Sequence, residues 1–337
     1  MKSLKIKIVT FASLLVAACA VNATGYSNVY VFGDSLSDNG NLSMAPGAPA
    51  GTPTRFTNGP VAVEVIAGAF GFALTPSDHL NGGYTGNNYA IAGAKAVDDD
   101  GDESTFDINL PTQVNAFLAI HGGVAPSDAL YIMLIGGNDI RAAREIRSAA
   151  VFAATPAERQ AIRQAANASL KAAVESEQAQ LLKLIAAGAS NILVSNAPDI
   201  GAIPETDLVA AGLLANAQTP KQERKAMRIP KVTTKLSAKY NRKLARKVAR
   251  IEHQTGVDII EYDLFSFLTD QIENGEDYGY SNVDDACIWI FSQGGVVNPE
   301  CSDFPTASGF LFWDEIHPTT TAHQGAGMEI VGELLAQ

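Results

Sequence analysis

The amino-acid sequence predicts an α/β fold built on a parallel, doubly wound sheet with helices on both faces. Short apolar segments typical of buried strands alternate with longer segments of helical periodicity, and this alternation indicates parallel βαβ units. The chain has 337 residues, 47% of them hydrophobic and 18% charged, so it can bury a large core. It contains no internal repeat and no long low-complexity linker. This composition excludes an intrinsically disordered protein.

The first 23 residues are predicted to be a secretory signal peptide. Three lysines precede an apolar run at 8–20, and residues 21–23, Val-Asn-Ala, offer a signal peptidase small side chains. A second interpretation is a bacterial lipoprotein box ending at Cys19, which would leave that cysteine lipidated. Residues 24–337 are then predicted to form a single domain. Because no later run of about 18 apolar residues follows, we expect a soluble, exported protein.

Four apolar segments are predicted to be the buried strands of the sheet. They are residues 29–32, 130–135, 192–194 and 257–260. Two segments between the strands have clear helical periodicity, residues 158–187 and the basic segment 221–250. In the basic segment an apolar residue recurs at every fourth position, which predicts one buried helix face. These apolar residues are Val232, Leu236, Tyr240, Leu244 and Val248.

Charge is distributed unevenly along the chain. The formal net charge is −12, and loss of the three lysines of the signal peptide makes it −15. Residues 221–250 nevertheless hold 12 of the 24 Lys and Arg and only one acid, Glu223. This segment is either the solvated face of an amphipathic helix or a surface for anionic lipid headgroups. Overall acidity and the export signal disfavour a nucleic-acid partner.

Two cysteines, Cys287 and Cys301, remain in the mature chain and are predicted to form a disulfide in an oxidising compartment. A loop of about 15 residues closed this way stabilises a fold by roughly 3 kcal/mol in the chain-entropy model. Two unpaired buried thiols are the alternative. No metal site is predicted, because two cysteines without a nearby histidine do not fill a tetrahedral site. The acidic run 98–103 lacks the bidentate acid of a calcium loop and is predicted to be a surface loop.

Polar side chains follow three of the predicted strands. Ser35 lies in "VFGDSLSDNGN" (31–41) after the first strand, "GGND" (136–139) follows the second, and "NAPD" (196–199) follows the third. The carboxyl ends of parallel strands share one rim, where ligands of such sheets bind. Gly, Asp, Ser and Asn are also ordinary turn residues. Ser35 is therefore either a turn residue or a nucleophile exposed at the rim.

A histidine and an aspartate lie three residues apart near the carboxyl end, in "FWDEIHPT" (312–319). A catalytic histidine needs an acceptor on its second ring nitrogen, and Asp314 can supply one to His317. Because Pro318 disfavours helical geometry at the preceding residue, the pair is predicted in a loop at or before a helix start. Two oxyanion donors are available, the side-chain amide of Asn138 and the backbone N–H of Gly93 in "NYAIAGAKA". Each of these signals is weak alone.

Together, the order and spacing of these segments resemble the SGNH, or GDSL, family of serine esterases and lipases. The resemblance covers nearly the whole mature chain, extends to residues 55–71, 196–204 and 238–244, and is best for the secreted lecithinase-like and hemolysin-like branch. It implies a three-layer, flavodoxin-like α/β/α sandwich and ester hydrolysis without a metal or cofactor. One departure is Ala-Gly-Ala at 92–94, where the family often has Gly-Gly-Ala.

Position by position, the resemblance assigns the site residues. Ser35 corresponds to the nucleophile, His317 to the base and Asp314 to the residue that orients the base. Gly93 and Asn138 correspond to the oxyanion donors beside the Ser35 amide.

Three functions are compatible with these residues. The first is hydrolysis of lipid or phospholipid esters, with acyl transfer when an alcohol replaces water. The second is removal of acetyl groups from carbohydrate, and the third is a non-catalytic surface protein of the same fold. Ester or lipid substrates and transient contact with a lipid surface are the expected partners; the oligomeric state is left open.

Several bulky apolar residues lie near the catalytic turn. They either form an acyl-chain wall or lid, or simply cover the core. They are Ile288, Trp289, Ile290, Phe291, Phe310, Phe312 and Trp313.

Overall fold

The computed structural model describes residues 25–83, 85–98 and 107–336. The predicted signal peptide, including Cys19, lies outside the described residues. So does the acidic run 98–103 apart from Asp98. The single domain predicted for residues 24–337 stays a prediction.

The centre of the fold is a sheet of four parallel strands in the order β1-β2-β3-β4. The strands are β1 (Val29–Gly33), β2 (Leu130–Leu134), β3 (Asn191–Ser195) and β4 (Ile259–Tyr262). All four predicted strands are therefore present. The last begins two residues later than predicted, because residues 256–258 form the loop after a helix that ends at Thr255, and the Val257 N–H donates to Thr255 Oγ1 at 3.2 Å.

An extended segment at residues 87–91 lies along the free edge of β1. The N–H groups of Tyr89 and Ile91 donate to Val31 and Gly33 carbonyls at 2.8 and 3.1 Å, and the Val31 N–H donates to the Asn87 carbonyl at 3.1 Å. Counted in chain order, the sheet then runs 2-1-3-4-5, which is the doubly wound order. The order reverses between β1 and β2, so the ligand crevice of such a sheet is expected beyond the end of β1.

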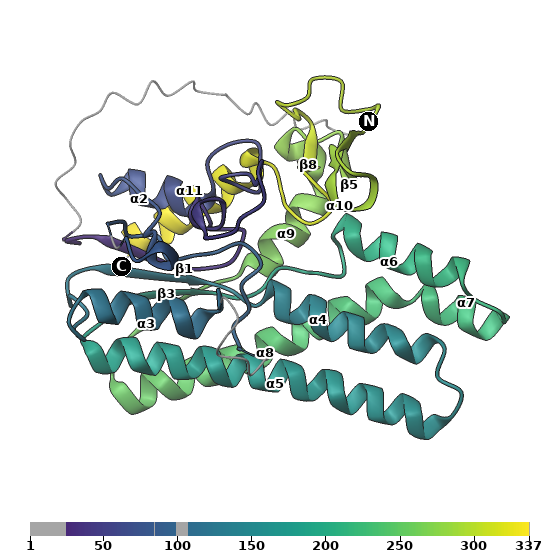
Figure 1. Ribbon diagram of the computed structural model, residues 1–337, viewed down its shortest axis with the longest axis horizontal. Coiled ribbons are helices and arrows are strands. Elements are labelled where there is room, and N and C mark those ends of the chain that lie inside the picture. The colour runs from purple at the N-terminus through teal and green to yellow at the C-terminus, as the bar shows by residue number, and fades with distance from the viewer. Residues whose placement is uncertain (1–24, 84, 99–106, 337) are drawn as a thin grey trace, which may run out of the picture.

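Helices cover both faces of the sheet and make three layers, as predicted (Figure 1). Alternate strand residues face opposite layers, so Val31 joins one hydrophobic cluster and Phe32 the other. One layer contains α2 (Ala62–Ala69) and α11 (Thr320–Leu335). The other contains α3 (Leu110–Ile120), α4 (Gly137–Ser148), α5 (Pro156–Ala187) and α8 (Ile229–Thr255).

The two predicted helical segments are helical, with one difference. Helix α5 begins at a capping box, in which Thr155 Oγ1 accepts from the Glu158 N–H at 3.1 Å. The basic segment is divided into α7 (Pro220–Ala226) and α8, because Pro230 in the first turn of α8 cannot continue a preceding helix. The apolar face predicted for α8 packs into the core through Leu236, Tyr240, Leu244 and Val248.

A smaller subregion joins the carboxyl-terminal part of the chain to the sheet. It contains the parallel pair β5 (Asn282–Ala286) and β8 (Phe310–Phe312) and the hairpin β6 (Ile288–Trp289) and β7 (Val296–Val297). Its helices are α9 (Leu264–Glu273) and α10 (Ile290–Gln293), while α6 (Pro204–Ala215) and α1 (Asn41–Met44) follow β3 and β1. Short 3-10 turns lie at His79–Asn81, Ala149–Val151 and Gly275–Tyr278.

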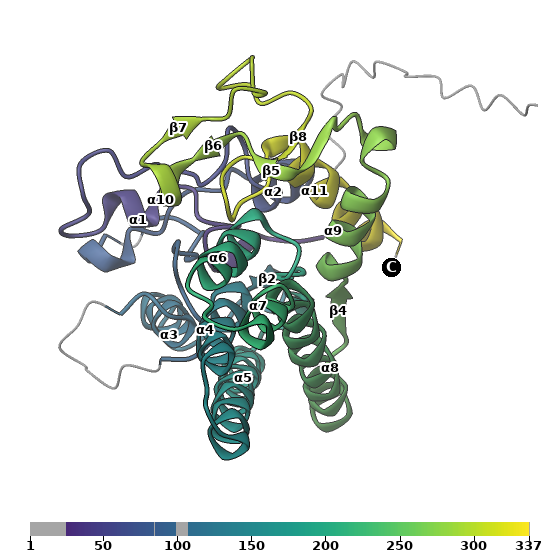
Figure 2. The same ribbon diagram turned by 90° about the vertical axis from the view of Figure 1, so that its right-hand side faces the viewer.

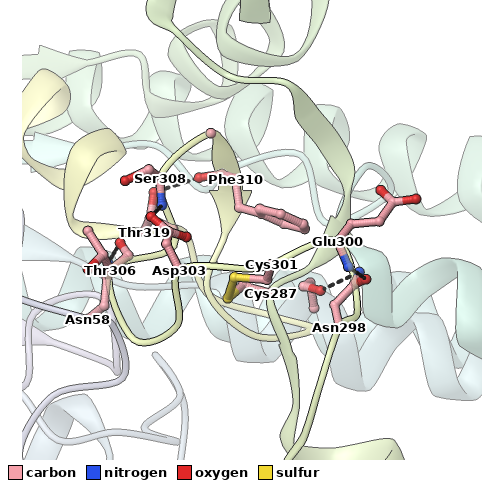
Figure 3. Close-up of a disulfide and its surroundings, with 12 residues drawn as sticks. Asn58, Cys287, Asn298, Glu300, Cys301, Asp303, Thr306, Ser308, Phe310 and Thr319 are labelled. Carbon is pink, nitrogen blue, oxygen red and sulfur yellow. Dashed lines mark hydrogen bonds between the residues drawn. A yellow bond between two sulfur atoms is a disulfide. The ribbon is translucent and has the colours of Figure 1, made fainter.

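The predicted disulfide between Cys287 and Cys301 is present, with an S–S distance of 1.96 Å (Figure 3). Both cysteines are buried. The Cys287 N–H donates to the Phe312 carbonyl at 3.1 Å, so the cross-linked loop is attached to the residues that directly precede Asp314. Among the described residues, no helix is long and apolar enough to cross a membrane.

Candidate active site

The structure brings Ser35, His317 and Asp314 together at the rim of the sheet. Ser35 Oγ lies 2.7 Å from His317 Nε2, although the two residues are 282 positions apart. His317 Nδ1 lies 2.8 Å and 2.9 Å from the two carboxylate oxygens of Asp314. All three side chains are buried or nearly so. A serine, an imidazole and a carboxylate are therefore joined in one hydrogen-bonded chain.

The loop that carries the histidine is fixed by Asp314 itself. The Asp314 Oδ1 atom accepts the N–H groups of Ile316 and His317, each at 2.8 Å. This turn lies immediately before α11, as predicted from Pro318. Because the same carboxylate holds the backbone and the ring, the imidazole is oriented before any substrate arrives.

Ser35 sits in a tight turn directly after β1. The Asp34 carbonyl accepts the N–H groups of Ser37 and Asp38, both at 3.0 Å, and Asp34 Oδ1 accepts the Leu36 N–H at 3.1 Å. Burial raises the pKa of Asp34 to about 6, although the hydrogen bond from the Leu36 N–H and the charge of Arg141 act in the opposite direction. The turn leaves the Ser35 N–H without a hydrogen-bond partner among the described residues.

Gly93 and Asn138 lie on two neighbouring loops. Gly93 has a positive φ of 87°, and its N–H has no partner within the described part of the chain. Asn138, in the first turn of α4, donates from Nδ2 to the Ala94 carbonyl at 2.9 Å and accepts from Arg141 Nη1 at 2.9 Å. The second hydrogen of this amide has no acceptor among the described residues and can donate to a substrate. Asn138 lines the same cavity as Ser35 and His317.

The chain from residue 29 to residue 330 matches the family model described as GDSL-like Lipase/Acylhydrolase. The chain belongs to the GDSL lipase/acylhydrolase family. The predicted esterase or lipase class is confirmed at the level of the family. The predicted lecithinase-like branch is not distinguished from other branches and stays a prediction.

Curated relatives of this GDSL chain carry lipase, esterase and acyltransferase names. Lipase 1 of Photorhabdus luminescens is 27% identical over 90% of this chain and 49% of its own length, so the chain spans about half of that relative. GDSL esterase/lipase EXL2 of Arabidopsis thaliana is 27% identical over 88% of this chain and 85% of the relative. Phosphatidylcholine-sterol acyltransferase of Aeromonas hydrophila is 24% identical over 92% of this chain and 90% of the relative.

Among solved structures, an extracellular lipase from Streptomyces rimosus covers 91% of the GDSL chain and 99% of its own. Its sequence identity is 15% and its TM-score is 0.38.

Two buried carboxylates that the sequence analysis did not single out hold the loops of the GDSL site together. The Asp38 carboxylate accepts N–H groups of Gly40, Asn41 and Leu42 and, at 2.8 Å, the N–H of Ala92. Asp139 Oδ2 accepts the Ala96 N–H at 2.8 Å, and burial raises the pKa of Asp139 to about 7. Asp38 lies in the motif VFGDSLSDNGN and Asp139 in the motif GGND. The sequence feature that could have identified both is a carboxylate beside Asn or Gly in a predicted turn.

The α4 loop also depends on a contact with the basic helix. Gly136 has φ of 111°, and a Cβ at this position would lie 2.6 Å from the ring of Tyr240. The Tyr240 hydroxyl donates to Glu177 Oε2 at 2.6 Å, and burial raises the pKa of Glu177 to about 8. Tyr240, which belongs to the predicted apolar face of α8, thus packs against the backbone at Gly136, two residues before Asn138.

In the third polar set at the rim, Pro198 lines the cavity that Ser35 and His317 line, whereas Asn196 and Asp199 are not among its lining residues. Asn196 donates from Nδ2 to Asp263 at 2.6 Å and accepts the Phe265 N–H at 2.9 Å. Asp199 accepts the Gly201 N–H at 2.8 Å. These side chains stabilise the loops that follow β3 and β4.

A largely apolar cavity opens from Ser35 and His317. Part of its wall comes from α9, through Leu264 and Phe267, and from α11, through Ala326 and Ile330. His323 also lines it; its Nδ1 accepts the Ala62 N–H at 3.3 Å. Burial, reinforced by the neighbouring His317, lowers the pKa of His323 to about 3, so this ring is neutral.

The bulky residues predicted to form either a wall or the core differ in how far they are buried. Phe310 and Phe312 are buried core residues, and Phe312 also lines the cavity. Trp313 stacks on Phe304 with ring centroids 5.3 Å apart. Phe291, by contrast, is 56% exposed, and its ring centroid lies 6.4 Å from that of His317.

Glu315, beside Asp314, fixes the position of Phe291. Its fully buried carboxylate accepts the N–H groups of Ile290, Phe291 and Ser292 at 2.8–3.2 Å and the Ser292 hydroxyl at 2.7 Å. A carboxylate at this end of α10 satisfies N–H groups that have no partner within the helix. The disulfide-closed loop is therefore attached to the turn that carries His317. Glu315 was not predicted from the sequence as a residue of the site.

Proposed function

We propose that this protein is an exported serine hydrolase that cleaves carboxylic esters of lipids through an acyl-enzyme on Ser35. The observation that carries the proposal is the 2.7 Å distance between Ser35 Oγ and His317 Nε2, with Asp314 on the other ring nitrogen. This is the arrangement that converts a hydroxyl into a nucleophile at neutral pH.

In the proposed first half-reaction, Ser35 Oγ attacks the ester carbonyl carbon while His317 Nε2 accepts its proton. Asp314 stabilises the resulting imidazolium. The C–O bond of the tetrahedral intermediate then breaks, and His317 returns the proton to the departing alcohol. In the second half-reaction water attacks the acyl-enzyme with His317 again as base, which releases the fatty acid and restores Ser35.

The oxyanion of each tetrahedral intermediate is proposed to bind three donors. They are the N–H groups of Ser35 and Gly93 and the side-chain amide of Asn138. The N–H groups of Ser35 and Gly93 have no hydrogen-bond partner among the described residues, so they are free to donate. The Asn138 amide is held in place because its Nδ2 donates to the Ala94 carbonyl and its Oδ1 accepts from Arg141. Such donors need no reorganisation when charge develops on the substrate oxygen.

Asn138→Ala is expected to lower kcat on a soluble ester by about 10² to 10³-fold, the usual cost of one oxyanion donor. The measurement is steady-state hydrolysis of a nitrophenyl ester. Asn196→Ala is the matched control, because this rim asparagine does not line the cavity and its side chain binds Asp263 and the Phe265 N–H at the start of α9; its kcat should stay within about threefold of wild type. A loss below threefold in Asn138→Ala would remove this side chain from the mechanism.

The lining of the cavity favours an acyl chain over an acetylated sugar. A sugar needs several hydrogen-bonding partners, whereas the part of the wall formed by α9 and α11 consists mainly of aliphatic and aromatic side chains. The alternative of a carbohydrate O-acetyl esterase is therefore less well supported.

Acyl transfer is the second candidate function. A relative named phosphatidylcholine-sterol acyltransferase aligns over 92% of this chain and 90% of its own length. The chemistry differs only in the second half-reaction, where an alcohol oxygen replaces water. Adding a sterol or a long-chain alcohol to the assay, and separating free acid from new ester, distinguishes the two.

The proposed substrate class is tested by a panel of acetyl sugars, short esters, triglycerides and phospholipids. We expect kcat/KM to rise with acyl length, and Phe291→Ala to lower it at least about tenfold for long chains but under threefold for acetate esters. Phe304→Ala is the matched control, since Phe304 is also exposed but stacks on Trp313. Equal losses on short and long esters would contradict a role of Phe291 in chain binding.

Export is supported by the disulfide and by the signal-like residues 1–23. The amino terminus of the processed protein distinguishes the two predicted routes. A start at Thr24 indicates ordinary cleavage, and palmitate labelling at Cys19 indicates a lipoprotein.

A further inference from the structure

The end of the helical layer away from the sheet is formed by four helices. The last turn of α4 meets the beginnings of α5 and α8 and the short helix α7, at the right-hand side of Figure 1, and α6 and α7 come forward in Figure 2. A small hydrophobic cluster of Val151, Ala210, Ala226 and Ile229 holds these elements together. The mechanism proposed above uses no residue of this region.

A cavity in this region is lined by five cationic side chains, which we call the basic tip. The basic tip consists of Arg147, Arg159, Arg163, Lys225 and Arg228. Residues 147–163 and 219–231 together contain eight Lys and Arg and two Glu, a net of +6, in a chain whose net charge is −12. The concentration of positive charge here is therefore opposite to the charge of the whole protein.

The charges of the basic tip are not neutralised by neighbouring carboxylates. Within the described residues, none of its five side chains forms a salt bridge. The nearby Glu158 is used by the backbone, since its Oε2 accepts the N–H groups of Ala154 and Thr155 at 2.7 and 3.2 Å. Like charges gathered in this way repel each other, and a bound anion would relieve the repulsion.

Contacts within the basic tip show the same repulsion. Burial and then Arg163 lower the pKa of Arg147, and burial and then Arg159 lower the pKa of Lys225. Lys225 is also held in place, because its Nζ donates to the carbonyls of Ala150 and Val151 at 3.0 and 2.9 Å.

Large apolar side chains are exposed beside these cations. Phe152 and Met227, which border the cluster in sequence, are 41% and 60% exposed. Helix α6 adds Leu208 and Leu214, 41% and 39% exposed, along its course from the active site to α7. Cationic side chains combined with exposed large apolar ones fit the headgroup region of a bilayer, whereas a small soluble anion would need only the cations.

We propose that the basic tip docks this protein on the surface of an anionic phospholipid bilayer. The cations bind headgroup phosphates, and Phe152 and Met227 enter the interface. Helix α4 links this surface to the active site: nine residues separate Asn138 from Arg147, about 14 Å along the helix axis. Docking would thus hold the catalytic cavity close to a bilayer. The proposal is independent of the chemistry at Ser35, because its readout is binding.

The test is co-sedimentation of the purified protein with vesicles. We expect binding to vesicles of equal parts phosphatidylglycerol and phosphatidylcholine, weakening with salt, and little binding to phosphatidylcholine alone. The combined variant Arg159→Gln, Arg163→Gln and Arg228→Gln should bind at least about tenfold more weakly, since each cation near an anionic surface adds to the attraction. Its hydrolysis of a soluble ester should equal that of wild type, which shows that it folds.

The matched control removes three charges from the other part of α8. Arg242→Gln, Arg246→Gln and Arg250→Gln change the net charge equally, and binding should stay within about twofold of wild type. An equal loss in this control would contradict a localised surface. A second variant, Phe152→Ser with Met227→Ser, should weaken vesicle binding while leaving all charges in place.

Three further outcomes would overturn the proposal. They are equal binding to neutral and anionic vesicles, displacement by inorganic phosphate at constant ionic strength, and binding to heparin without binding to vesicles. The second result would indicate a small-anion site and the third a soluble polyanion.

Discussion

Replacing Ser35 by alanine is expected to lower kcat on a nitrophenyl ester by about 10⁶-fold, the scale found when a triad serine is lost, and to leave the fold intact. The Ser35 hydroxyl contacts His317 Nε2, and alanine removes only this oxygen from the edge of a cavity. Steady-state hydrolysis and a thermal unfolding scan measure the two effects. A fluorophosphonate should label wild type at Ser35 and should not label the variant.

Ser37→Ala is the matched control for this experiment. It makes the same chemical change two residues away, at a buried hydroxyl that accepts no hydrogen bond from the described residues. We expect its activity to stay within about threefold of wild type. An undiminished rate in Ser35→Ala would refute the acyl-enzyme. Absence of fluorophosphonate labelling in wild type would instead favour the non-catalytic alternative.

Replacing Asp314 by asparagine is expected to lower kcat by about 10⁴-fold, as for the corresponding change in other serine triads. Asparagine keeps the size of the side chain and one acceptor for the turn. It no longer stabilises an imidazolium, and it favours the wrong tautomer of His317. The measurement is kcat on the same nitrophenyl ester at neutral pH, with circular dichroism to confirm the fold.

Asp303→Asn is the control for Asp314→Asn. Asp303 belongs to the same carboxyl-terminal subregion, and its carboxylate accepts the Ser308 N–H at 3.0 Å (Figure 3). Its activity should be within about twofold of wild type. A loss below tenfold in Asp314→Asn would show that the histidine does not depend on this carboxylate.

The sheet was largely predictable, because each strand is a local property of the chain. Buried parallel strands appear as short apolar runs, and all four runs became strands of the sheet. The extended segment at residues 87–91 was not predicted, because it is not a short apolar run. Its residues pair with β1 on one side, make a single parallel bridge to Pro76 on the other, and carry Asn87 and Asn88, whose side chains bind neighbouring loops. Polar residues of this kind indicate a turn when the sequence is considered alone.

The break between α7 and α8 shows a related limit. The basic residues continue across residues 227–228, with Arg224, Lys225 and Arg228 before the apolar repeat that begins at Val232, so the charge pattern alone predicts one helical segment. Pro230 requires a new helix to begin here, because proline is tolerated in the first turn of a helix but not in its interior.

The candidate site was predictable as a set of residue types. Each candidate residue lies in a recognisable sequence motif. These residues are Ser35, Gly93, Asn138, Asp314 and His317. Asp38, Asp139 and Glu315 were missed as positioning residues, because their importance lies in backbone N–H groups from other segments. Such partners are found only when the loops are seen together.

The sequence by itself determined the strands, the main helices, the candidate nucleophile and base, and the family. These are set by local periodicity, turn chemistry and the order of motifs. Only the tertiary structure decided that Ser35 and His317, 282 residues apart, lie within hydrogen-bonding distance, and that Glu315 anchors Phe291 beside them. The physical reason is that these contacts depend on the register of the sheet and on burial of groups from distant segments, which no local pattern records.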